Sequence, residues 1–143
     1  MNNNIITLKE ICEKSYNVLK ARGYSPVYDD DEHIGFECVV GGGLLTFYPI
    51  EDDVFGYAAE FKLERALTSE QRAHLERIYM EMEAEDVAFE NLHIQDDCIV
   101  MSSAFTCDFY PEDMMELSIK VLESENGITA EIKSIITTIE EDV

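Results

Sequence analysis

Hydrophobic and polar residues follow two different periods along this chain, and the change of period marks the elements that it predicts. Thr7-Leu8-Lys9-Glu10 has the form of a helix capping box, and apolar residues recur at helical spacing after it. Gly23 supplies the left-handed conformation that ends many helices. The pattern therefore predicts a helix from Leu8 to Arg22.

A stretch with strand-like alternation follows this helix. Its predicted strands are Tyr24–Tyr28, Ile34–Val40, Leu44–Ile50 and Val54–Leu63. Pro26 limits the first to an edge or irregular strand, and Gly41-Gly42-Gly43 permits a hairpin turn. Alternation in the last strand places Phe55, Tyr57, Ala59 and Phe61 on one face. We therefore expect a meander in which each strand pairs with its sequence neighbour.

A second capping box, Thr68-Ser69-Glu70-Gln71, predicts a helix that ends near Ala84. Two more strands, Phe89–Gln95 and Cys98–Phe109, are predicted to form a hairpin around Asp96-Asp97. In the second of these strands, alternate residues from Ile99 to Phe109 are expected to point inward.

The last helix is predicted to begin at Pro111, a residue favoured in the first helical turn. Asn126-Gly127 is typical of a helix end. An apolar stripe nevertheless crosses the glycine in steps of four and three: Met114, Ser118, Val121, Glu125, Ile128, Ile132, Ile135 and Ile139. This unbroken register favours one long helix to about Ile139, kinked at Gly127, over the alternative of two short helices.

The predicted order is α-β-β-β-α-β-β-α, with a weak extra strand before the meander. Antiparallel strands interrupted by single helices indicate an α+β fold, in which helices cover one face of an antiparallel sheet of five or so strands. The length of 143 residues fits a single domain that spans residues 1–143.

The chain is strongly acidic, with 31 Asp and Glu against 10 Lys and Arg and a formal charge of −21. Most carboxylates gather in predicted turns. Such a surface repels phosphate backbones and anionic lipids, so we expect neither nucleic-acid nor membrane partners. Mimicry of nucleic acid would need regularly spaced carboxylates instead.

No secretory signal or membrane segment is evident, and a cytoplasmic location is expected.

The four cysteines, Cys12, Cys38, Cys98 and Cys107, lack the spacing of a metal site. They occur in apolar segments, so we expect them to be reduced and buried. Asp29-x-Asp31-x-His33 starts like a calcium loop but lacks the glycine and glutamate that the loop requires.

No motif in the chain carries recognisable catalytic chemistry, so we expect no enzymatic activity and no cofactor. His33, His74 and His93 stand in three different elements. The alternative is a small enzyme or metal-binding protein with a sparse site around His93, Asp96 and Asp97.

The candidate partner-binding residues are the isoleucines of the last helix, which are Ile128, Ile132, Ile135, Ile136 and Ile139. Either this face only docks the helix on the sheet of its own chain, or it is shared with a second subunit or a partner protein.

By its element order, its size, its acidity and a long last helix that opens at Tyr110-Pro111-Glu112, the chain resembles the type III secretion chaperone-like fold. It is similar in particular to bacterial YbjN-domain proteins. The resemblance implies a convex antiparallel sheet backed by helices, often as a homodimer, and a binding role without catalysis. We therefore expect a cytoplasmic protein-binding module, chaperone-like or regulatory, that acts through sheet edges and apolar helix faces.

Overall fold

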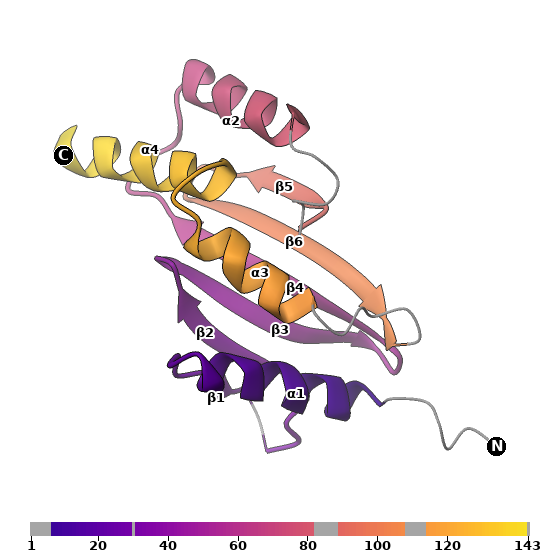
Figure 1. The fold of residues 1–143 in the computed structure, drawn as a ribbon. Coiled ribbons are helices and arrows are strands. Elements are labelled where there is room, and N and C mark those ends of the chain that lie inside the picture. Colours follow the sequence, from indigo (N-terminus) through magenta and orange to yellow (C-terminus); the bar gives the residue numbers. More distant parts are fainter. Residues whose placement is uncertain (1–6, 30, 82–88, 108–113, 143) are drawn as a thin grey trace.

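A six-stranded antiparallel sheet with helices packed on one of its faces forms the centre of the structure (Figure 1). The computed structural model describes residues 7–29, 31–81, 89–107 and 114–142. The strands are β1 (Val27–Tyr28), β2 (Phe36–Val40), β3 (Gly43–Glu51), β4 (Val54–Lys62), β5 (Asn91–Ile94) and β6 (Cys98–Thr106). The helices are α1 (Leu8–Ala21), α2 (Ser69–Glu81), α3 (Met114–Glu123) and α4 (Ile128–Asp142). The predicted α+β class is confirmed.

The strands follow the order β1-β2-β3-β4-β6-β5, and every neighbouring pair is antiparallel. The predicted meander is therefore confirmed for β1 to β4, and the predicted hairpin for β5 and β6. Gly41 and Gly42 form the turn between β2 and β3 with φ angles of +59° and +84°. Two positive φ angles in succession define the type I′ turn, which matches the twist of a two-residue hairpin.

The two capping boxes begin helices as predicted. Thr7 Oγ1 accepts a hydrogen bond of 3.1 Å from the backbone N–H of Glu10 at the start of α1. At the start of α2, Thr68 Oγ1 accepts from the N–H of Gln71, and the Gln71 side chain accepts from the N–H of Thr68. These bonds satisfy backbone donors that have no partner inside the helix.

The core lies between the helices and the inner face of the sheet. Phe55, Tyr57 and Ala59 of β4 are fully buried, and Phe61 is 1% exposed, as the alternation predicts. The ring of Phe47 lies 4.8 Å from that of Phe55 and 5.6 Å from that of Tyr57, between centroids. Burial of these aromatic side chains removes apolar area from water and so stabilises the fold.

The C-terminal region is two helices, so the prediction of one long helix is wrong. Helix α3 ends at Glu123, and α4 begins at Ile128 after a turn in which Gly127 has a φ of +81°. Ser124 Oγ accepts from the N–H of Asn126 and donates to its carbonyl oxygen, which stabilises the turn. A residue with this φ leaves the right-handed helical region, so the helix stops there.

The predicted stripe is also displaced within α3. Met114 and Val121 are half-buried, whereas the buried residues of this helix are Met115, Ser118, Ile119 and Leu122. In α4 the four isoleucines of the predicted stripe, Ile128, Ile132, Ile135 and Ile139, are buried. The turn reorients the chain between the helices, so the continuous spacing across Gly127 does not describe a continuous face.

Several predicted element boundaries differ from the observed ones or lie outside the described residues. The strand expected over residues 24–28 is limited to Val27–Tyr28, where Tyr28 stacks between Tyr16 of α1 and His33. The helix end at Ala84, the position of Phe109 and the helix start at Pro111 lie outside the described residues. In the described part of the chain, no helix combines the length and hydrophobicity needed to cross a membrane.

Candidate functional site

The predicted partner-binding isoleucines are covered by the chain itself. Ile128, Ile132 and Ile139 are at most 2% exposed, Ile135 is 8% exposed, and Ile136 is half-buried against the core. Helix α4 packs beside α2, where His74 Nε2 lies 3.0 Å from the Glu131 carboxylate. This face of α4 is therefore buried within its own chain in the structure.

The alternative site around His93, Asp96 and Asp97 has no metal-binding geometry. Asp96 and Asp97 are exposed in the turn between β5 and β6, and His93 is an exposed residue of β5. Among the described residues, no group of three or more His, Cys, Asp or Glu side chains is placed to hold a metal ion. The Asp97 carbonyl accepts a hydrogen bond of 2.9 Å from the N–H of Leu63, so this turn has a structural role.

The outer face of the sheet, opposite the helices, is a further candidate surface that is not among the sequence predictions. Strand register places Val39, Leu44, Glu60, Val100 and His93 side by side in one row of this face. None of them belongs to the hydrophobic core or packs against it. The period-2 alternation contains this information, because residues between inward-facing positions must face outward.

Apolar and small side chains dominate the outer face. The neighbouring row contains Thr46, Ala58 and Ser102, and the next row contains Gly56 and Ala104. The ring of Tyr48 lies across Gly56 and occupies the place of a β-carbon at that position. Val39 is 67% exposed, although Val is a strongly apolar residue.

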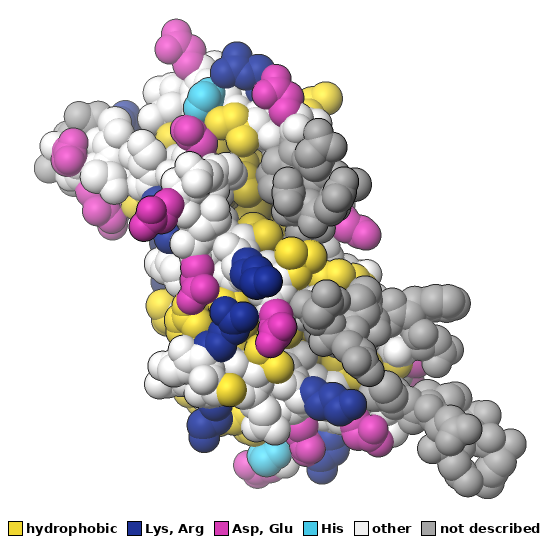
Figure 2. All heavy atoms as spheres, in the orientation of Figure 1, with side chains coloured by type: hydrophobic (Ala, Val, Ile, Leu, Met, Phe, Trp, Pro, Cys, Tyr) yellow, Lys and Arg dark blue, Asp and Glu magenta, His cyan; other side chains and the backbone are white. Residues whose placement is uncertain are grey.

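The outer face is also poor in charge. Nineteen outward positions follow from the register: Val27, Glu37, Val39, Leu44, Thr46, Tyr48, Glu51, Val54, Gly56, Ala58, Glu60, Lys62, Asn91, His93, Cys98, Val100, Ser102, Ala104 and Thr106. They include three carboxylates and one ammonium group, which sum to −2, in a chain of formal charge −21. The helix side, in contrast, carries many Lys, Arg, Asp and Glu side chains (Figure 2).

A groove runs between α2 and the edge strand β5. It has a volume of about 500 Å³ and is lined by Arg72, Glu76, Tyr79 and Met80 of α2 and by residues 92–95. Met80 is 83% exposed at its rim. Four consecutive residues line the groove from the strand side, so it lies along the strand edge and not over one face.

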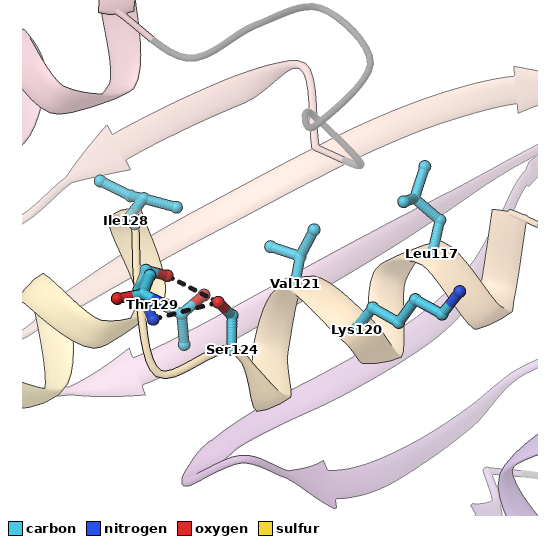
Figure 3. Close-up of a pocket in the computed structure, with 8 residues that line it drawn as sticks. Leu117, Lys120, Val121, Ser124, Ile128 and Thr129 are labelled. Atoms are coloured by element: carbon cyan, nitrogen blue, oxygen red, sulfur yellow. Dashed lines mark hydrogen bonds between the residues drawn. The ribbon is translucent and has the colours of Figure 1, made fainter.

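A second hollow, of about 410 Å³, lies at the turn between α3 and α4. Leu117, Val121 and Ile128 point to the same side, toward β5 and β6 (Figure 3). Apolar side chains are visible between α2 and α3 in the surface view (Figure 2). Thr129 also lines this hollow; it is 1% exposed, and its Oγ1 has no hydrogen-bond partner among the described residues.

Burial raises the pKa of several tyrosine and cysteine side chains. It is the main reason why the pKa of Tyr24 rises to about 12, and a hydrogen bond from Tyr24 to Glu123 adds to the effect. Burial also raises the pKa of the Cys38 and Cys98 thiols, and for Cys98 the Asp97 and Glu60 carboxylates add to it. These thiols remain protonated near neutral pH and are poor nucleophiles.

Comparison of the chain with known proteins finds no match to a protein-family model, to a curated protein or to a solved structure.

Proposed function

We propose that this protein is a non-enzymatic protein-binding module, chaperone-like or regulatory, that binds its partner on the outer face of the sheet. The observation that carries the proposal is the charge of this face: its outward positions sum to −2 in a chain of formal charge −21. Protein-binding surfaces are depleted of charge at their centre. The resemblance to YbjN-domain and type III secretion chaperone-like proteins favours the same kind of role.

The dimensions of the face suit a protein partner. Strands β3, β4 and β6 have nine residues each, which corresponds to roughly 30 Å along the strands. Strand β2 has five residues and β5 has four, so the five strands β2 to β6 together cover on the order of 600 Å². This is at the lower end of the roughly 600–1,000 Å² that each partner buries in a standard-size interface.

Acidic turns surround the face and define the chemistry of the partner. Glu51, Asp52 and Asp53 lie at the β3–β4 turn, and Asp96 and Asp97 lie at the β5–β6 turn. A partner with an apolar centre and a basic rim would complement both the face and its border. Added salt should slow the association of the partner with this face and should have less effect on the apolar contacts in the complex.

The test compares two charge insertions. Ala104→Glu adds a carboxylate at an exposed position of the outer face, and Thr138→Glu adds one at an exposed position of α4. Both variants should fold, as judged by circular dichroism and melting temperature. Tagged wild-type protein should retain a partner from its native extract, Thr138→Glu should retain the same partner, and Ala104→Glu should lose it by about tenfold or more. Equal retention by all three proteins contradicts the proposal.

A further inference from the structure

Strand β5 is the last strand of the sheet and pairs with β6 on one side only. The N–H of Gln95 donates a hydrogen bond of 2.9 Å to the carbonyl of Cys98 at the hairpin end. Hydrogen-bonded pairs alternate along an antiparallel ladder, so Asn91 and His93 exchange bonds with β6. The N–H and C=O groups of Leu92 and Ile94 therefore point away from β6, and no strand in the described part of the chain pairs with them.

These backbone groups face the groove beside α2. Arg72, Glu76, Tyr79 and Met80 have the spacing of one helical stripe, and they form the opposite wall. Tyr79 Oη donates a hydrogen bond of 2.8 Å to the carbonyl of Phe89, just before β5. This bond joins α2 to the chain just before β5, so the position of the helix beside the strand is fixed at one end of the groove.

The groove offers apolar contacts at alternate positions. Leu92 and Ile94 are half-buried on the inner side of β5, and the exposed Met80 of α2 lines the same groove. An added strand would place every second side chain on this inner side. Small apolar side chains at those positions would contact Leu92, Ile94 and Met80.

The charges around the groove define the ends of its occupant. Arg72 and Glu76 cancel within the groove. Exposed Glu90 precedes β5, and exposed Asp96 and Asp97 follow it. The groove therefore has a neutral centre and two acidic ends, which is complementary to an extended segment with apolar residues in the middle and Lys or Arg at its ends.

We infer that the groove between α2 and β5 binds an extended peptide segment of this kind, which adds to β5 as a seventh strand. The segment donates and accepts main-chain hydrogen bonds at Leu92 and Ile94, and its apolar side chains lie beneath Met80. This inference shares with the proposed function only the binding of protein, because it uses the sheet edge and not the outer face.

The probe for the test is a dye-labelled synthetic peptide in which Val and Thr alternate between terminal lysines. It should bind wild-type protein saturably, as measured by fluorescence anisotropy, and should slow hydrogen exchange at the amides of Leu92 and Ile94. Met80→Gln should weaken binding by about tenfold, the effect of losing one good apolar contact. Thr138→Gln, the matched polar substitution on an exposed face of α4, should bind as wild type does.

Two control peptides test the mode of binding. A peptide with N-methylated alternate amides has lost its strand hydrogen bonds and should not bind, and a peptide with terminal glutamates should bind at least tenfold more weakly. Absence of saturable binding up to millimolar peptide overturns the inference. Equal binding of the N-methylated peptide, or unchanged exchange at Leu92 and Ile94, overturns it as well.

The same peptide separates this inference from the proposed function. Ala104→Glu should bind it as wild type does, because Ala104 lies on the outer face and not in the groove. Loss of peptide binding in Ala104→Glu would show that the groove does not bind independently of the outer face. Failure of the peptide to bind wild-type protein would leave the partner-retention result on the outer face intact.

Discussion

A β-carbon on Gly41 would overlap the backbone carbonyl of Leu122, so the β2–β3 turn packs directly on the last turn of α3. Lys133 of α4 donates a hydrogen bond of 3.3 Å to the same carbonyl oxygen. The carbonyl oxygen of Leu122 thus links α3 to the β2–β3 hairpin, which is far away in the sequence, and to the following helix α4. Glycine suits this position for two reasons. Its φ of +59° is unfavourable for other residues, and it has no side chain that would collide with α3.

Gly41→Ala should therefore destabilise the protein more than Gly23→Ala. Both glycines have positive φ, which costs alanine about 1–2 kcal/mol. A β-carbon at Gly23 would meet nothing within 4 Å, whereas at Gly41 the backbone of α3 would have to move. We expect a loss of about 1 kcal/mol for Gly23→Ala and about 3 kcal/mol for Gly41→Ala in chemical denaturation. Equal losses would show that the contact with Leu122 does not constrain the turn.

Ile132→Ala should lower the free energy of unfolding by about 2–5 kcal/mol, since Ile132 is fully buried. Thr138→Ala, on the exposed side of the same helix, should change it by about 0.5 kcal/mol or less. Because α4 is buried within its own chain, the melting temperature of both variants should not depend on protein concentration. A melting temperature that rises with concentration would point to a second subunit on this face.

Thr129→Val should leave stability unchanged or raise it by about 1 kcal/mol. The Thr129 hydroxyl is buried without a hydrogen-bond partner among the described residues, and valine replaces it with a methyl group of similar shape. Thr129→Ser keeps the hydroxyl, removes the methyl and should destabilise by about 1 kcal/mol. Destabilisation by valine, measured in urea, would reveal a hydrogen bond to this hydroxyl.

Stability should fall between about pH 10 and pH 12. The pKa of Tyr24 rises from 10.0 in the unfolded chain to about 12 in the fold, mainly by burial. The folded state thus favours the protonated phenol, and this contribution is complete below pH 10 and lost as pH rises through 12. Tyr24→Phe should reduce the loss across this range, as measured by urea denaturation. An identical slope in wild type and Tyr24→Phe would contradict the assignment to Tyr24.

The four cysteines should react slowly with a thiol reagent in the native protein and completely in denaturant. None of the four forms a disulfide, and all four are buried. Burial also raises the pKa of Cys38 and Cys98, which lowers their thiolate fraction. Mass spectrometry of the labelled protein would identify each site. Rapid native labelling of either residue would show that its strand opens readily.

The sequence predicts most of the fold because its local signals agree with the tertiary packing. Alternation identifies the buried face of β4, and the two capping boxes locate the starts of α1 and α2. The break at Gly127 was missed because apolar spacing records which side of each helix is buried and not whether the backbone between them is continuous.

The candidate surfaces were harder to predict. The isoleucines of α4 were singled out for their hydrophobicity, but which apolar face remains uncovered depends on how α2 and α4 pack. The outer face and the β5 groove depend on strand order. That β6 pairs with β4, and so places β5 at the edge, does not follow from any single segment.

The position of β4 between β3 and β6 has a consequence for synthesis of the chain. Strand β3 precedes β4 and can pair with it at once, whereas β6 is made only after α2 and β5. A nascent chain that ends before residue 98 therefore presents one edge of the nine-residue β4 unpaired. The half-made chain on the ribosome is thus the form of this protein most exposed to aggregation.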